Sequence, residues 1–237
     1  PAMDLIFERM PATLELVAVA ACLVLCIAIP LGVYAGAYPK RASSKLIMSG
    51  SILGISLPSF WVGMMMIYIF AVVLRLLPAS GRGNTVMVGN VALSIFAPGG
   101  IRYVILPAIT LALTNVATML RLTRSGILEN MRQDYIKFAR AKGVPAKSIL
   151  FGHALKNALI PVVTIFGMDL GNMIAFTTIT ETIFAWPGMG KLLIDAINKS
   201  DRPIIVAYLM AAACMFVVLN FIVDILYTLI DPRIELR

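Results

Sequence analysis

Long uncharged apolar stretches alternate with short polar ones along the whole chain, and this alternation predicts membrane-spanning helices. Each stretch is long enough for a helix to cross the hydrocarbon layer, which takes about 20 apolar residues. Proline punctuates several of them, and Pro58 predicts a bend in the second. We therefore expect an all-α, polytopic membrane helical bundle with five transmembrane helices in this chain, at about residues 14–38, 46–76, 103–128, 157–181 and 204–230.

The composition supports this fold class and argues against a soluble one. The chain is 60% hydrophobic and 14% charged, with a mean hydropathy of +0.92, whereas about a quarter of the residues are charged in a typical soluble domain. The net charge of +8 could indicate a nucleic-acid partner. The basic residues cluster between apolar stretches instead, as topology signals do, so we expect one transmembrane domain over residues 1–237 and no nucleic-acid partner.

Charge bias also predicts the orientation. Residues 39–45, residues 121–156 and the C-terminal tail carry thirteen of the 20 Lys and Arg residues, which places these segments in the cytoplasm by the positive-inside rule. The C-terminus is then cytoplasmic and Pro1 external. Because no signal peptide precedes an external start, we expect a first span upstream of this sequence and six spans in the full subunit.

The polar interval at residues 129–156 predicts two short helices at an angle on the membrane surface. Asp134 to Lys142 is suited to the first and Ala146 to Leu155 to the second, with Gly143 and Pro145 between them. Small residues at the bend would let another backbone approach closely. The alternative is a solvated basic loop that sets the topology and has no partner.

The ordered motifs in this interval resemble those of one transporter family. Lys137–Gly143 reads KFARAKG, Leu155 follows twelve residues after Gly143, and the run from His153 to Val162 reads HALKNALIPV. These motifs resemble the EAA loop of ABC importer permease subunits of the dipeptide/oligopeptide/nickel family. Lys137 stands where the general pattern has glutamate, and Lys156 where it has proline, as in the peptide/nickel branch. The resemblance continues through the ETIFAWPGMGKLL run at Glu181–Leu193 and the DPRI run at Asp231–Ile234.

This resemblance implies a subunit of an ATP-driven importer in the bacterial inner membrane. Its partners would be a second homologous permease, two ABC ATPase subunits, a periplasmic or lipid-anchored solute-binding protein and membrane lipid. ATP and magnesium would bind the ATPases, so this subunit would be no enzyme and hold no cofactor. The residues expected to couple it to the ATPases are Asp134, Lys137, Ala139, Arg140, Ala141, Lys142, Gly143, His153 and Leu155.

Polar residues inside the apolar stretches are candidates for the translocation path. Asp169 lies in the middle of a predicted span, and an acid at membrane depth is a functional hypothesis by default. Asn115 and Asn172 are similar candidates. The alternative is that Asp169 pairs with a polar group on a neighbouring helix.

Two other functional classes remain as alternatives. A stand-alone channel or secondary transporter would need coupling-ion residues within the spans, and an intramembrane enzyme would need a nucleophile with its base or a set of metal ligands there. The chain has one histidine and no predicted metal site, and it lacks the GxxxxGK[ST] motif of a nucleotide-binding loop. The sequence does not identify the solute, which could be a di- or oligopeptide, a nickel chelate or a glutathione-like peptide.

Overall fold

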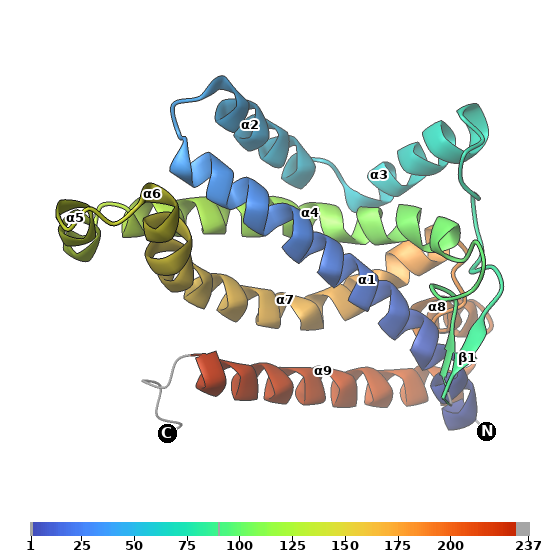
Figure 1. Ribbon diagram of the computed structural model, residues 1–237. Helices are drawn as coiled ribbons and strands as arrows, with labels where there is room; N and C mark the ends of the chain where they lie inside the picture. Colours follow the sequence, from blue (N-terminus) through green and yellow to red (C-terminus); the bar gives the residue numbers. More distant parts are fainter. Residues whose placement is uncertain (1, 90, 231–237) are drawn as a thin grey trace. The chain divides into compact units, whose positions relative to one another are not determined.

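Four long helices carry most of the chain in a computed structural model that describes residues 2–89 and 91–230. They are α1 (Ala2–Ala37), α4 (Ile101–Asn130), α7 (Leu155–Ile183) and α9 (Arg202–Ile230) (Figure 1). Each belongs to a helical run long and apolar enough to cross a membrane. A helix satisfies its own backbone hydrogen bonds, which lipid requires of any spanning segment. The predicted all-α membrane bundle is confirmed.

The second apolar stretch forms a broken helix. It comprises α2 (Ala42–Ser56), α3 (Ser59–Met66) and the π-helical segment η1 (Ile67–Val73). The break falls at Leu57 and Pro58, where Pro58 is extended with φ −62° and ψ 132°. A proline has no N–H to donate to the preceding turn, so the helix restarts after it. Counted as one broken span, this segment raises the number of candidate spans from four to five.

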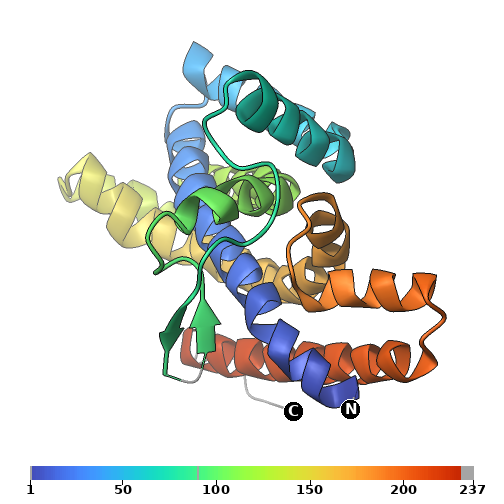
Figure 2. The ribbon, with the colours of Figure 1, turned by 90° about the vertical axis from the view of Figure 1, so that its right-hand side faces the viewer.

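A small β-hairpin lies in the segment between η1 and α4, which separates the second and third predicted spans. Strands β1 (Val86–Val88) and β2 (Val91–Leu93) lie side by side (Figure 2). They pair antiparallel, with Val88 opposite Val91. Gly89 has a φ of +63°, which a two-residue hairpin turn requires. The described residues of this segment form no spanning helix, in agreement with its glycine and proline content.

The second of the two predicted surface helices is not a separate element. The chain runs without a break from α6 (Ala146–Ser148) through the π-helical segment η2 (Ile149–Ala154) into α7. No proline interrupts this run until Pro161, inside α7. One wide turn in η2 therefore joins what we expected to be a surface helix to the spanning helix. Only α5 (Asp134–Ala141) stands alone as a short helix in this part of the chain.

Contacts divide the chain into two compact units. The first comprises Pro1–Leu23, Leu57–Leu113 and Leu170–Asn220, and the second Val24–Ser56, Thr114–Asp169 and Phe221–Arg237. In the first, α8 (Met189–Asn198) packs Met189 with Ile6 of α1 and Tyr208 of α9. The core of the second lies where α5 meets the long helices.

Close helix packing in the second unit depends on two glycines of α1. A Cβ at Gly32 would lie 2.6 Å from the Cβ of Thr123, and one at Gly36 would lie 2.7 Å from the Cβ of Ile127. Both partners belong to α4. Small residues four apart allow this approach of two helices in lipid. Gly50 of α2 has no atom within 4 Å of such a Cβ, so this glycine serves no close contact within the described chain.

Candidate functional site

The helix α5 is built by local sequence signals at both ends. Gln133 is extended before its first turn, Asp134 opens that turn and Arg140 closes the last, which places opposite charges favourably on the helix dipole. Gly143 has a φ of +76°. Its N–H donates to the carbonyl of Arg140, and the N–H of Val144 donates to that of Ala139. These two bonds form a Schellman cap, which ends the helix at a residue that favours glycine.

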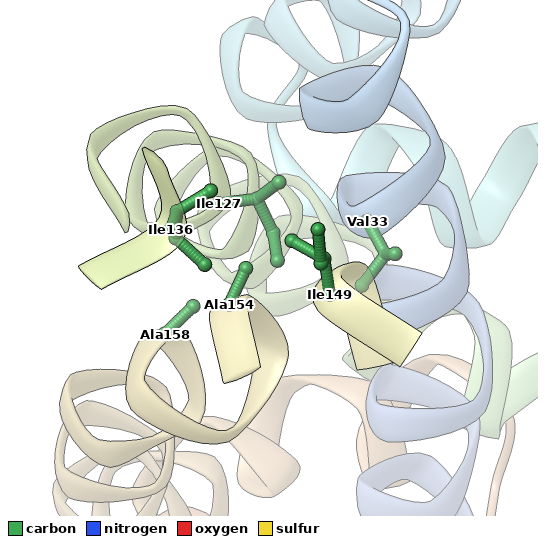
Figure 3. Close-up of a cluster of buried hydrophobic side chains, with 6 residues drawn as sticks. All are labelled: Val33, Ile127, Ile136, Ile149, Ala154 and Ala158. Carbon is green, nitrogen blue, oxygen red and sulfur yellow. The ribbon is translucent and has the colours of Figure 1, made fainter. Parts of the chain in front are cut away.

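The inner face of α5 is held by a group of buried apolar side chains that we call the loop cluster. Figure 3 shows Ile136 of α5 directed toward side chains from four other helical segments. The six members are Val33 of α1, Ile127 of α4, Ile136, Ile149 and Ala154 of η2, and Ala158 of α7. Apolar side chains buried in this way hold their elements at fixed spacing, because interiors pack densely. The loop cluster therefore fastens α5 to the ends of three long helices.

A hydrogen-bonded tyrosine reinforces the same junction. The hydroxyl of Tyr135 donates to Oδ1 of Asn130 at 2.7 Å and accepts from Nδ2 of Asn157 at 3.0 Å. These partners lie at the end of α4 and the start of α7. One side chain of α5 thus bridges two long helices by polar contacts beside the apolar ones.

The opposite face of α5 is exposed and carries cationic and aromatic groups. Phe138 is 62% exposed, and Nζ of Lys142 lies 4.5 Å from its ring centroid. The carboxylate of Asp134 accepts a hydrogen bond from Lys137 at 2.8 Å, which lowers the pKa of Asp134. The stability that this ion pair adds is present above the ordinary pKa of an aspartate and is lost as the pH falls through the lowered pKa of Asp134. It is small because both side chains are exposed.

The predicted coupling residues fall into an exposed set and a supporting pair. The exposed set is Asp134, Lys137, Arg140, Ala141, Lys142, Gly143 and His153. Ala139 and Leu155 are half-buried and pack against the loop cluster. The sequence did not single out Tyr135 or Ile136, although they hold the short helix in place. Ala154 and Ala158 lie within the HALKNALIPV run, so the motif itself was the available signal for those two.

The three candidate path residues do not form one site within either unit. Asn115 and Asp169 are half-buried and belong to the second unit, whereas Asn172 is exposed on α7 in the first. Their assignment to a translocation path stays a prediction. No group of three His, Cys, Asp or Glu side chains that could hold a metal ion occurs within residues 2–89 and 91–230.

A buried carboxylate of α1, which the sequence analysis missed, anchors the hairpin segment in the first unit. Oε1 of Glu15 accepts hydrogen bonds from the N–H groups of Ser94 and Ile95, both at 2.7 Å, and from the Ser94 hydroxyl at 2.9 Å. Oε2 accepts from Nε of Arg82 at 2.9 Å, and Arg82 also donates to the carbonyl of Ala92 at 2.7 Å. Only 1% of the Glu15 side chain is exposed, so its charge is balanced by these donors.

A second buried carboxylate, Glu181 of α7, holds the start of α8. It accepts from the hydroxyl of Thr13 at 2.7 Å and from the N–H of Lys191 at 2.9 Å. The Thr13 oxygen in turn accepts from the N–H of Met189 at 2.8 Å. Nε1 of Trp186, which is fully buried, donates to the carbonyl of Ala12 at 2.9 Å. One short segment of α1 thus ties down both the hairpin segment and α8, and we call this set the carboxylate anchor.

Comparison with protein families gives one match over most of the chain. Residues 28–236 match the family described as "Binding-protein-dependent transport system inner membrane component". The chain is 41% identical over 235 residues to the oligopeptide transport system permease protein AppB of Bacillus subtilis (strain 168), covering 99% of this chain and 72% of that protein. It is 40% identical over 237 residues to the di/tripeptide transport system permease protein DppB of Pseudomonas aeruginosa (strain UCBPP-PA14), covering 95% and 70%.

Solved structures share the fold at low identity. A chain of the MetNI methionine ABC transporter, solved in inward-facing conformations, superposes with a TM-score of 0.73 at 16% identity, covering 98% of each chain. A chain of an amino acid ABC transporter solved with histidines superposes with a TM-score of 0.61 at 14% identity, covering 98% of this chain and 94% of that one. At these identities the likeness concerns the arrangement of helices alone.

Proposed function

The chain belongs to the family of binding-protein-dependent transport system inner membrane components, and from this premise we propose that it is a peptide-importing permease subunit driven by partner ATPases through α5. The observation that carries the proposal is the loop cluster. It joins the inner face of α5 to three long helices and leaves the outer face free within the described chain. A short helix built in this way can receive a displacement on one face and pass it on from the other.

The exposed face supplies the contact with an ATPase. Phe138 offers a large aromatic side chain, and aromatic residues at the centre of an interface contribute most to binding. Lys137, Arg140 and Lys142 are exposed nearby in the sequence and add positive charge to this segment, which favours an acidic partner surface and speeds its association. ATP and magnesium bind the two partner ATPases in this proposal, so the permease itself performs no catalysis.

The packing beneath α5 turns that contact into movement of the spans. Packed interiors move between discrete arrangements and do not deform continuously. A shift of α5 therefore moves the ends of α4 and α7 that meet it in the loop cluster and at Tyr135. With a second homologous permease, such shifts alternate access between the two membrane faces.

The proposal also includes the orientation of the chain in the membrane and the class of solute that it transports. We place α5 and the C-terminus in the cytoplasm and the hairpin segment outside the bacterial inner membrane, as the distribution of Lys and Arg favours. A solute-binding protein delivers the cargo on the outer side. The two relatives named for oligopeptides and for di- and tripeptides favour a peptide over a nickel chelate.

The experiment replaces Phe138 with Asp and co-expresses the permease pair with its ATPases. We expect Phe138→Asp to weaken co-purification of the ATPases by about thirtyfold or more, because loss of a central aromatic anchor costs about 2 kcal/mol or more. Peptide-stimulated ATP hydrolysis in proteoliposomes with the binding protein should fall in parallel. The matched control is Phe96→Asp, which alters a side chain that is 66% exposed in the first unit.

Comparison of the two variants shows whether α5 is the contact with the ATPases. Phe96→Asp should leave ATPase assembly unchanged. A Phe138→Asp permease that assembles and stimulates like the wild type would show that α5 is not the coupling element. Peptide uptake that follows an ion gradient and continues without ATP would instead support a secondary transporter.

A further inference from the structure

A cavity in the first unit carries two arginines and has no role in the function proposed above. It has a volume of about 480 Å³ and lies between the end of η1 and the start of α4. Arg75, Asn84, Gly99, Arg102 and Tyr103 are among the residues that line it, and none of the lining residues is acidic. Positive charge is therefore concentrated at one hollow of the surface without a neighbouring carboxylate.

Neither arginine of the cavity has a side-chain partner in the part of the chain that the structure describes. Both side chains belong to exposed residues, and neither guanidinium makes a hydrogen bond or ion pair within residues 2–89 and 91–230. Arg82, in the same unit, differs because Glu15 and the carbonyl of Ala92 hold it. Two unpaired guanidiniums at one cavity provide forked donors that match the oxygens of a phosphate group.

The backbone brings the first arginine to the cavity through an unusual conformation. Arg75 has a φ of +52°, which a residue with a side chain rarely adopts. The N–H of Leu76 donates to the carbonyl of Phe70 at 2.9 Å, so the end of η1 folds back and holds this turn closed. A strained residue that the surrounding structure holds is a reason to look for a function, and here it places a cation at the cavity that Arg102 also lines.

The surface next to the cavity is apolar. Four large apolar side chains here are each at least 50% exposed: Val72 and Val73 at the end of η1, and Leu74 and Leu76 just after it. A small hydrophilic anion would gain nothing from such a surface, whereas acyl chains would cover it. The ring of Tyr103, which has an apolar body and a polar tip, suits the boundary between acyl chains and headgroups.

We propose that this cavity binds the phosphate headgroup of an anionic glycerophospholipid, with Arg75 and Arg102 holding the phosphate and the end of η1 receiving the acyl chains. The site is independent of the ATPase contact at α5. It predicts a preference for a lipid with net negative charge over a zwitterionic one, because no lining carboxylate is available to pair with a choline or ethanolamine group.

The test counts the lipids retained by the purified permease complex in native mass spectrometry. Phosphatidylglycerol and phosphatidylcholine are titrated separately into the delipidated complex. We expect phosphatidylglycerol to be retained preferentially, and Arg75→Gln and Arg102→Gln each to weaken its retention about fivefold, the contribution of one basic residue near an anionic membrane surface. Arg75→Lys and Arg102→Lys keep the charge and should lose less.

A matched control and a competitor distinguish this site from other sources of binding. Arg202→Gln removes an exposed arginine of the same unit outside the cavity and should leave phosphatidylglycerol retention unchanged. Inorganic phosphate should not displace the lipid, because it lacks acyl chains. The proposal is overturned if phosphatidylcholine is retained equally, if Arg202→Gln loses as much lipid as the cavity variants, or if the cavity variants keep their lipid and lose the binding protein instead.

Discussion

Gly143 allows the role of a single backbone conformation to be tested at the residue scale. Its φ of +76° ends α5, and no atom lies within 4 Å of a Cβ built on it. A Gly143→Ala change should therefore destabilise the cap only through the backbone, by about 1–2 kcal/mol. We expect faster limited proteolysis between α5 and α6 in the detergent-solubilised protein.

Asparagine is the informative companion at this position, because it tolerates the left-handed conformation better than alanine. Gly143→Asn should retain more protease resistance than Gly143→Ala although its side chain is larger. If Asn proves more harmful than Ala to ATPase assembly, then Gly143 is needed for close approach of the partner and not for its backbone conformation.

Substitution of Glu15 tests how much a buried charge contributes to the stability of the protein. Glu15→Gln keeps the size of the side chain but removes the charge that Arg82 faces, and the Arg82 side chain, only 10% exposed, would lose its charged partner. Breaking a buried pair in this way costs about 3–5 kcal/mol, so we expect a clear drop in the thermal midpoint of the solubilised protein. Glu8→Gln, an exposed acid on the same helix, should have almost no effect.

A double variant shows whether the pair acts as a unit. Glu15→Gln with Arg82→Gln removes both charges together, so its destabilisation should be smaller than the sum of the two single effects. Additive effects would show that Glu15 acts mainly through the N–H groups of Ser94 and Ile95 and owes little to Arg82.

The two faces of α5 lead to opposite expectations at the scale of the element. Ile136 is fully buried in the loop cluster, and Ile136→Ala should cost about 2–4 kcal/mol through lost packing and the cavity left behind. We expect the ATPases still to assemble with this variant, while peptide-loaded binding protein no longer stimulates ATP hydrolysis, because α5 is loosened from α4 and α7. Phe138→Ala should do the reverse and weaken assembly at unchanged thermal stability.

The contact between α1 and α4 gives a second prediction for elements. Gly36→Ala would place a Cβ 2.7 Å from the Cβ of Ile127, and such overpacking costs about 1–3 kcal/mol. Gly50→Ala adds the same methyl group where nothing lies within 4 Å and should be neutral or slightly stabilising. The measurement compares the thermal midpoints of unfolding of the two variants. Equal changes in the midpoint would mean that helix propensity, and not close packing, governs both sites.

The elements also show what a single sequence can predict. The long helices follow from apolar runs, because span length and the absence of charge are local properties. The hairpin had a local signal as well, since two short apolar runs flank a Gly-Asn pair, but the surrounding glycines and prolines favoured an irregular loop. The union of η2 with α7 had no such signal, because a wide turn that joins two helices is decided by packing of Ile149 and Ala154 in the loop cluster.

The candidate site was predictable only in part, for the same reason. The exposed residues of α5 belong to a contiguous motif, so their positions could be named from the sequence. Their support depends on Val33, which lies about a hundred residues upstream of Ile136 in the sequence. The carboxylate anchor joins Glu15 to Ser94 and Ile95, which are 79 and 80 residues away from it. Such pairings arise from tertiary packing, which periodicity along one stretch does not encode.

At the scale of the whole molecule, the proposed function requires the hairpin segment and α5 to face opposite sides of the membrane. Cysteine labelling tests this in cells after Cys22, Cys26 and Cys214 are replaced by serine. A Met87→Cys variant places a thiol on the hairpin, where the native side chain is 63% exposed, and a Phe138→Cys variant places one on α5. Both positions are accessible, so differences in labelling report on the side of the membrane and not on burial.

We expect a membrane-impermeant maleimide to label Met87→Cys in intact spheroplasts and Phe138→Cys only after the membrane is opened, because the excess of Lys and Arg around α5 retains that segment in the cytoplasm. Expression of the partner ATPases should then slow the labelling of Phe138→Cys in opened membranes but not that of Met87→Cys. Labelling of both thiols in intact spheroplasts would refute the orientation. Unchanged labelling of Phe138→Cys on assembly would preserve the orientation and remove α5 from the ATPase interface.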